Sequence, residues 1–245
     1  MIKVIEFGPA PANIVDRANV AYLRQQLAAA ADDKSIKLVV IKGEGDHFSY
    51  GASVQEHTPD LVGNMLREFH DFMRFVDELD LPPLMAAVKG RCFGGGFEVA
   101  LLCDIIAVAD DALLGCPEIS LGVFPPAGSA LLPLRTTAGR ASEMLSSGRF
   151  VDAQTAVAYG IAEYKFSADN FMSDIEEWAE KSFAKLSASS LRHTRKASRW
   201  PYSHALNTVL PDLEKQYLES LMKTADANEG INAFIEKRKP EGQNR

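Results

Sequence analysis

Two patterns of apolar positions alternate along the first 110 residues. Residues 38–41 are apolar on both faces and too few for a helix, which predicts a buried strand. Apolar residues recur every three or four positions in the longer segments 16–33 and 61–79, which predicts helices. Three more segments are predicted as strands: residues 1–7, 84–88 and 105–109. This order of strands and helices predicts βαβ units with right-handed crossovers.

The chain changes character after residue 140. Helical periodicity continues there without a further clear apolar strand. The sequence therefore predicts an α/β fold, with a parallel-rich core over residues 1–190 and a helical C-terminal part over residues 191–245.

The overall charge limits the partners. The chain has 245 residues and a formal net charge of −7. Nucleic acids and anionic membranes attract clustered Lys and Arg, so this balance argues against both. No apolar stretch approaches the roughly 20 residues that span a bilayer, and the N-terminus is typical of a strand rather than a signal peptide. A soluble, cytoplasmic protein is expected.

Cysteines and histidines give no indication of a metal. Cys92, Cys103 and Cys116 form no CxxC pair, and the five histidines are scattered singly. We therefore predict no metal site, and we expect the thiols to be small buried groups in a reducing compartment.

The most informative segment is the glycine triplet Gly94–Gly96, between a predicted strand and a helix that carries Glu98. Free N–H groups at a helix N-terminus attract negative charge, and glycine lets a ligand approach the backbone. Because the segment lacks the Walker Lys-Ser/Thr pair and the GxGxxG spacing, it favours a carbonyl oxygen that becomes negative over a phosphate. On the glycines alone, a tight turn with close packing is the more common explanation.

Two further segments gain meaning only beside the first. The loop Phe48–Ser53 follows the strand at 38–41 and offers the Ala52 N–H as a second donor to the same oxygen. The segment Gly115–Gly122 places Glu118 after a proline. Alone, the first is an ordinary small-residue loop and the second a solvated turn carboxylate.

Together these segments resemble the crotonase superfamily of enoyl-CoA hydratases and isomerases. The resemblance covers essentially the whole chain, and its motifs are Gly94–Glu98, Cys103-Asp104, Pro117-Glu118, Leu121-Gly122 and residues 229–240. The resemblance implies the ClpP/crotonase fold, a spiral of βαβ units with a helical C-terminal part. It also implies that Ala52 and Gly95 supply the oxyanion-hole N–H groups for a thioester carbonyl.

The resemblance further implies a partner and an assembly. The substrate is then an acyl-CoA thioester, and because coenzyme A is part of it, no separate cofactor is expected. Family members assemble as trimers or as hexamers of two trimers. The resemblance therefore implies a homotrimer or homohexamer, with residues 191–245 as the oligomerisation region.

Family members with both glutamates are typically hydratases, so the resemblance assigns catalysis to Glu98 and Glu118. Adding water to an activated alkene needs one group to take a proton from water and another to deliver a proton to carbon. Which glutamate is acid and which is base stays open at this point. We expect the helix N-terminus to favour the ionised form of Glu98.

Short segments around positions 9–13, 51–57 and 122–124 resemble the cyclohexa-1,5-diene-1-carbonyl-CoA hydratases of anaerobic aromatic degradation. Ser53 stands where the family commonly has an acidic residue. Pro125 and Pro126 give the loop after Glu118 a different shape, because proline fixes φ and removes a backbone donor. We predict contacts with the acyl group by eight residues: Tyr50, Gly51, Ser53, His57, Gly94, Phe124, Pro125 and Pro126. Arg91 and Lys237 are predicted to bind coenzyme A, although a surface or packing role explains His57 and the basic C-terminal end as well.

The alternatives are a straight-chain 2-enoyl-CoA hydratase, an enoyl-CoA isomerase, and a non-catalytic RNA- or protein-binding relative. The net charge of −7 and the absence of a basic stripe argue against RNA. The two glutamates argue against a scaffold without activity.

Overall fold

Five parallel strands form the main sheet of the computed structural model, which describes residues 1–244. Their order across the sheet is β1 (Ile2–Phe7), β2 (Leu38–Gly43), β3 (Leu84–Val88), β5 (Ile105–Ala109) and β8 (Tyr164–Phe166). The predicted strands at residues 1–7, 38–41, 84–88 and 105–109 are thus present. The parallel sheet with its helices has the predicted α/β class.

Helices cover both faces of this sheet, which is why its central strands are apolar throughout. In β2, Val39 and Ile41 belong to the main core, which also holds residues of the helices on that face, whereas Leu38 and Val40 pack with the opposite helix. The helices on the main-core face are α1 (Arg17–Asp32), α2 (Val62–Glu78) and α3 (Gly95–Leu102). The opposite helix is α7 (Phe171–Phe183).

A second, three-stranded sheet includes the short strand that leads into the glycine turn. It consists of β4 (Arg91–Phe93), β6 (Leu113–Gly115) and β7 (Val151–Asp152), with β4 parallel and β7 antiparallel to β6. The sequence shows no further clear apolar strand after residue 140, yet the strands β7 and β8 lie there. Both are two or three residues long, and β8 is at the edge of its sheet, so neither needs the apolar run by which a strand is recognised.

Short helices connect the two sheets to the C-terminal part. Those next to the candidate site are η1 (Val54–His57), η2 (Glu118–Leu121) and α4 (Pro126–Leu131). The others are η3 (Leu132–Leu134), α5 (Ala138–Ser147) and α6 (Ala153–Ala158).

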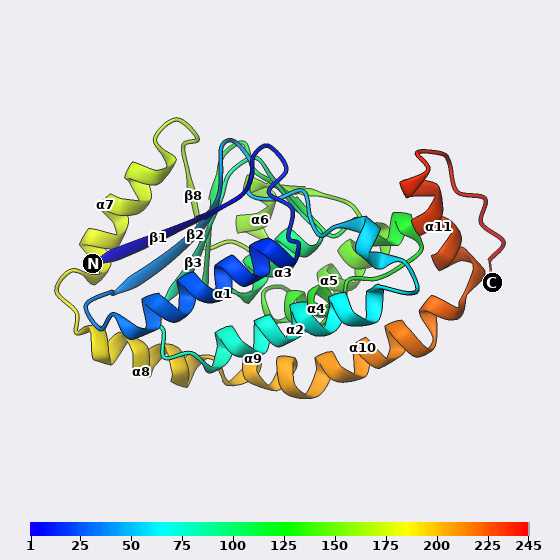
Figure 1. Cartoon of the computed structure of the whole chain (residues 1–245). Helices are drawn as coiled ribbons and strands as arrows, with labels where there is room; N and C mark the ends of the chain where they lie inside the picture. The colour runs from blue at the N-terminus through cyan, green and yellow to red at the C-terminus, as the bar shows by residue number, and fades with distance from the viewer. Residues whose placement is uncertain (245) are drawn as a thin grey trace.

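The C-terminal part is helical, as predicted. It contains α8 (Ala188–Ser198), α9 (Trp200–His204), the π-helix η4 (Ala205–Val209), α10 (Leu210–Glu219), η5 (Leu221–Lys223) and α11 (Ala225–Ile235). α8, α9 and α10 follow one another along one side of the molecule beside α1 and α2, and α11 lies at the end remote from the N-terminus (Figure 1). The limit at residue 190 stays a prediction. Within residues 1–244, every helix is too short or too polar to cross a membrane.

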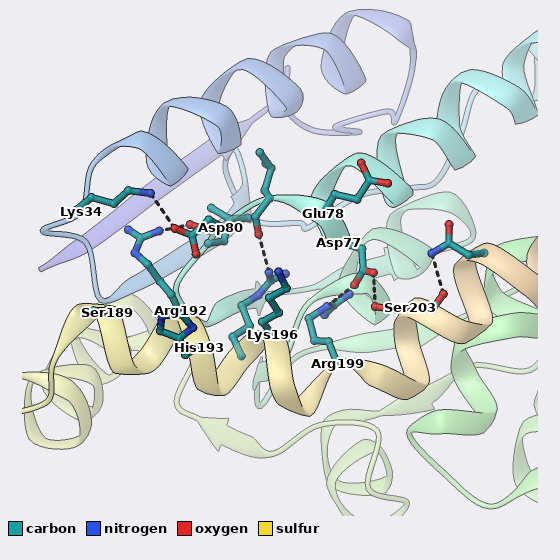
Figure 2. A pocket seen from close by; sticks show the side chains of 14 residues that line it. Lys34, Asp77, Glu78, Asp80, Ser189, Arg192, His193, Lys196, Arg199 and Ser203 are labelled. Carbon is teal, nitrogen blue, oxygen red and sulfur yellow. Dashed lines mark hydrogen bonds and ion pairs between the residues drawn. The ribbon is translucent and has the colours of Figure 1, made fainter.

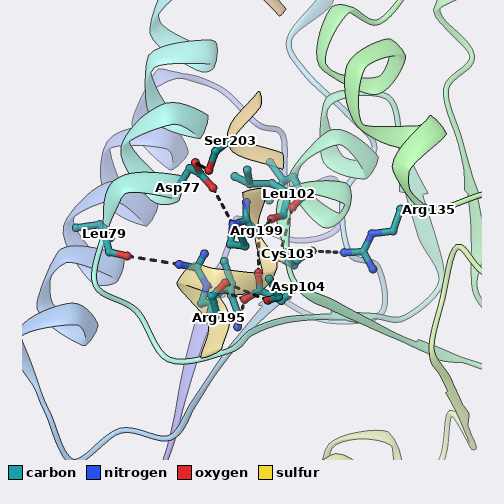
Figure 3. A network of polar contacts seen from close by, with 12 residues as sticks. Asp77, Leu79, Leu102, Cys103, Asp104, Arg135, Arg195, Arg199 and Ser203 are labelled. Carbon is teal, nitrogen blue, oxygen red and sulfur yellow. Dashed lines mark hydrogen bonds and ion pairs between the residues drawn. The ribbon is translucent and has the colours of Figure 1, made fainter. Parts of the chain in front are cut away.

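Three buried arginines tie this C-terminal part to the core, and Figure 3 shows two of them, Arg195 and Arg199. Arg199 bonds Asp77 at 2.7 Å, Asp104 at 2.5 Å and the Leu102 carbonyl at 3.0 Å. Arg195 bonds Asp104 at 2.7 Å and the Leu79 carbonyl at 3.4 Å. Although burial opposes ionisation, the charges of Arg195 and Arg199 hold the pKa of Asp104 below its usual range.

The third arginine, Arg192, donates to the carbonyls of Asp33 at 2.8 Å, Ala31 at 3.4 Å and Asp80. The three arginines together therefore bind backbone carbonyls at the C-terminal ends of α1, α2 and α3, where the helix dipole is negative.

Candidate active site

A cavity of about 280 Å³ joins the three segments that the sequence singled out. The residues from those segments that line it are Tyr50, Gly51, Ala52, His57, Gly94, Gly95, Glu98, Glu118, Phe124, Pro125 and Pro126. Apolar side chains of α2 and α11 complete the wall: Met65, Leu66, Phe69, Ile231 and Phe234. Eleven of the twelve catalytic, oxyanion-hole and acyl-contact residues predicted from sequence thus line one cavity.

Ser53 is the exception, because it does not line this cavity. Ser53 precedes η1, and its carbonyl accepts a 2.9 Å hydrogen bond from Nδ1 of His57. Burial lowers the pKa of His57, so its imidazole is neutral at the cavity wall.

The two residues predicted to bind coenzyme A also lie outside the lining. Arg91 donates to the Tyr50 hydroxyl at 3.3 Å and lies 5.4 Å from the centre of that ring, which places it beside the cavity. Lys237 follows α11 with an exposed side chain and a φ of +55°. Their roles in binding coenzyme A stay predictions.

The Ala52 and Gly95 N–H groups meet at one wall of the cavity. Gly95 is the first residue of α3, so its N–H has no partner within the helix. A Cβ built on Gly95 would lie 3.1 Å from the Ala52 nitrogen, which shows how closely the two backbones approach. Within residues 1–244, neither N–H donates to another group of the chain. Both are available to a carbonyl oxygen.

Residues 12–15 hold the loop that carries Ala52. The buried Asn13 side chain donates to the carbonyls of Glu44 at 2.9 Å and His47 at 2.8 Å. The Val15 N–H bonds the Gly51 carbonyl at 2.9 Å, which turns that carbonyl away from the cavity. The loop is therefore fixed before any ligand binds.

Glu98 lies in the first turn of α3 and is 5% exposed. Its Oε1 accepts a 2.7 Å hydrogen bond from the Gly128 N–H, and the Ala127 N–H also favours its charged form. Burial nevertheless outweighs these donors and raises the pKa of Glu98 above its ordinary value. We expected the helix N-terminus to favour the ionised form of Glu98. That expectation left out burial, which has the larger effect on the pKa and the opposite direction.

Glu118 begins η2 on the other side of the cavity. Burial, and next the charge of Glu98, raise the pKa of Glu118 to about 8. Its Oε2 is buried and has no hydrogen-bond partner within residues 1–244. The negative charge of Glu98 therefore opposes ionisation of Glu118, so the two carboxyl groups titrate as a coupled pair.

Gly94 is required where these parts meet. Its φ is +48°, and a Cβ there would lie 2.6 Å from Oε1 of Glu118. Only glycine allows both this backbone conformation and this position of the carboxyl group.

Two further polar residues near the glutamates were not predicted from the sequence. His70 of α2 is fully buried, and its Nδ1 lies 2.8 Å from Oε2 of Glu214 on α10. When protonated, His70 favours the charged form of Glu98. Tyr217, one turn after Glu214, lines the cavity. Both residues occupy ordinary positions of amphipathic helices, so no local pattern distinguishes them from core residues.

A larger cavity of about 730 Å³ lies between the C-terminal end of α2 and α8 (Figure 2). Its lining includes Arg192, Arg195 and Arg199, the arginines that bind helix ends and acidic side chains. Lys34 at its rim pairs with Asp80 at 2.9 Å. Because these charged groups are bound to one another, we assign the candidate active site to the smaller cavity. No group of three or more His, Cys, Asp or Glu suited to a metal occurs among residues 1–244.

The sequence profile described as Enoyl-CoA hydratase/isomerase matches residues 2–245. The chain belongs to the enoyl-CoA hydratase/isomerase family. Cyclohexa-1,5-dienecarbonyl-CoA hydratase of Thauera aromatica is 41% identical to it, over 96% of this chain and 90% of the relative. 2,3-Dehydroadipyl-CoA hydratase of Escherichia coli (strain K12) is 34% identical, over 97% of this chain and 92% of the relative.

Two solved structures share the fold of this chain. Pseudomonas aeruginosa DspI is 30% identical with a TM-score of 0.76, over 99% of this chain and 93% of that chain. An enoyl-CoA hydratase from Mycobacterium avium subsp. paratuberculosis K-10 has a TM-score of 0.85 at 24% identity, over 99% of this chain and 95% of that chain. The latter shows the shared fold. The family and fold expected from the motifs are confirmed.

Proposed function

We propose that this enoyl-CoA hydratase/isomerase family member is a hydro-lyase that adds water to an α,β-unsaturated acyl-CoA thioester, and that its acyl group is a cyclic diene. One observation carries the hydratase assignment. Two buried carboxyl groups, Glu98 and Glu118, face one cavity beside the free N–H groups of Ala52 and Gly95.

The surroundings of the two glutamates suggest their roles. Glu98 accepts backbone N–H groups and so holds the negative charge of the pair, which suits the base. Glu118 has an unpartnered Oε2 and a pKa of about 8, which suits the acid. In this scheme Glu98 takes a proton from water as the carbon–oxygen bond forms, and Glu118 later gives a proton to carbon.

The two backbone donors act on the negative charge formed between these steps. As oxygen adds to the alkene, the displaced electron pair moves to the thioester oxygen, where the Ala52 and Gly95 N–H groups bind it. Loss of one such donor typically costs about 3 kcal/mol of transition-state stabilisation.

A ring substrate is supported by the most identical relative described above and by the shape of the cavity. The Thauera aromatica relative is named for cyclohexa-1,5-dienecarbonyl-CoA. The cavity has a proline-shaped wall at Pro125 and Pro126, with aromatic rings at Phe69 and Phe124. Such rigid apolar surfaces suit a planar ring. A conjugated diene also delocalises the negative charge to the thioester oxygen, so the Ala52 and Gly95 N–H groups can stabilise it in the same way.

The test is a comparison of cyclohexa-1,5-diene-1-carbonyl-CoA with crotonyl-CoA. We expect kcat/KM to be at least tenfold higher for the ring diene, because specificity is differential transition-state binding. A ratio near or below one would exclude the ring preference and favour a straight-chain hydratase, which the 34% identity to the dehydroadipyl-CoA enzyme supports as the second candidate. Absence of hydration with both esters would exclude the hydratase assignment.

We further propose a cytoplasmic homotrimer or homohexamer without a separate cofactor, nucleic-acid partner or membrane partner. Large apolar side chains on the C-terminal helices support assembly, since Trp200 is 76% and Phe234 55% exposed. Light scattering after size-exclusion chromatography would give the mass of the assembly, and a monomer would contradict it.

A further inference from the structure

The cavity contains a polar group that the proposed chemistry has not used. Tyr217 of α10 lines the cavity and is 1% exposed. Its ring packs edge-on against Phe124, with ring centres 5.5 Å apart. Its hydroxyl oxygen is buried and has no hydrogen-bond partner within residues 1–244.

A second unpartnered atom borders the same cavity. Oε2 of Glu118 is also buried without a hydrogen bond, and Glu118 lies on η2, an element remote from α10 in sequence. Burial, followed by the charges of Glu118 and Glu98, raises the pKa of Tyr217. The phenol therefore keeps its proton across the working range of pH and is able to donate a hydrogen bond.

Packing alone does not explain a tyrosine here. Phenylalanine has the same ring and would make the same edge-on contact with Phe124. A buried hydroxyl without a partner costs free energy, which phenylalanine avoids. The hydroxyl group therefore indicates an acceptor that enters the cavity with the ligand.

We propose that Tyr217 is a third catalytic residue, which donates its hydroxyl hydrogen bond to the oxygen atom that becomes the product's hydroxyl group. This rests on the proposed hydratase function. During hydration that oxygen loses one proton to Glu98 and forms a bond to carbon, while the alkene electron pair moves to the thioester oxygen. Tyr217 keeps its own proton throughout, so it positions the attacking water and then binds the new hydroxyl group.

The first test is Tyr217→Phe, assayed on whichever of cyclohexa-1,5-diene-1-carbonyl-CoA and crotonyl-CoA the wild-type enzyme hydrates better. We expect kcat to fall roughly 10- to 100-fold, the range for losing one hydrogen bond to a reacting group, with KM changed less than about threefold. Tyr22→Phe on the exposed surface of α1 is the matched control and should keep full activity. Incorporation of 3-fluorotyrosine at position 217, which keeps a hydroxyl donor, should retain most of kcat.

The second test measures binding rather than turnover. It compares 3-hydroxybutyryl-CoA with butyryl-CoA, which lacks the hydroxyl group. The wild-type enzyme should bind the hydroxylated ester more tightly, and Tyr217→Phe should lose about tenfold of that preference while binding butyryl-CoA unchanged. Equal kcat and equal preference in the variant would overturn the role of Tyr217. A wild-type enzyme that hydrates no enoyl-CoA would instead overturn the proposed function, because the binding comparison does not depend on turnover.

Discussion

At the scale of single residues, Glu98 and Glu118 have the same side chain but different surroundings. Glu98 has backbone N–H donors, whereas Oε2 of Glu118 has no partner in the described chain. Two identical carboxyl groups thereby acquire different proton affinities within one cavity. Their proximity also makes each dependent on the other, since the charge of Glu98 raises the pKa of Glu118.

Glu98→Gln and Glu118→Gln test this dependence. Each change should lower kcat by about 10² to 10⁴, because each removes one of two proton transfers, while the affinity for a saturated acyl-CoA stays within a few fold. The double variant should be hardly slower than the worse single variant, because the pair acts as a unit. Steady-state kinetics with isothermal titration of butyryl-CoA measure both. Near-normal turnover in either single variant would show that residue to be non-catalytic.

At the scale of elements, the turn before α3 sets the positions of the groups that form the candidate active site. Gly94 brings β4 into α3 with a positive φ, which leaves room for Glu118 and exposes the Gly95 N–H. The N-terminus of α3, the loop before η1 and η2 thus meet at a point where no side chain larger than hydrogen fits.

Gly94→Ala should therefore damage the site far beyond the size of one methyl group. We expect kcat to fall at least 100-fold, because the new Cβ displaces the Glu118 carboxyl group and strains the backbone. Gly63→Ala, in α2, is the matched control: a Cβ there meets nothing within 4 Å. It should keep activity and change the free energy of unfolding by less than about 1 kcal/mol. Equal kinetics in both variants would contradict the assigned role of Gly94.

Sequence patterns identified the elements whose signals are local. Helices α1 and α2 show regular periodicity, and β2, β3 and β5 are continuous apolar runs, so their positions followed from the chain itself. The motifs around Gly95 and Glu118 were informative only in combination, because each one alone is common in ordinary turns. Tyr217 and His70 could not be found in this way. Each is an ordinary helix residue until α10 packs against α2, and that packing depends on contacts between residues far apart in sequence.

At the scale of the whole molecule, the site influences stability as well as activity. A raised pKa means that folded Glu118 holds its proton more tightly than the unfolded chain does. Its protonated form contributes stability fully below pH 4.5, and this contribution is lost as pH rises through about 8. The free energy of unfolding should therefore decrease over this interval.

Urea unfolding of the wild-type enzyme and Glu118→Gln from pH 4.5 to 8.5 measures this contribution. The difference in the free energy of unfolding between the wild-type enzyme and the variant should change by up to about 1.4 kcal/mol per pH unit, the value for one proton. The variant should gain relative stability at high pH, because glutamine carries no charge into the cavity. A difference that does not vary with pH would contradict the raised pKa.

The buried arginines of the C-terminal part also bear on the order in which the protein is made. Helices α1, α2 and α3 are synthesised first, yet their terminal carbonyls and the side chains of Asp77 and Asp104 receive their cations from residues 192–199. A ribosome must therefore translate about four-fifths of the chain before these groups are neutralised. Until then, these carbonyl groups and carboxylates lack the cations that bind them in the folded protein.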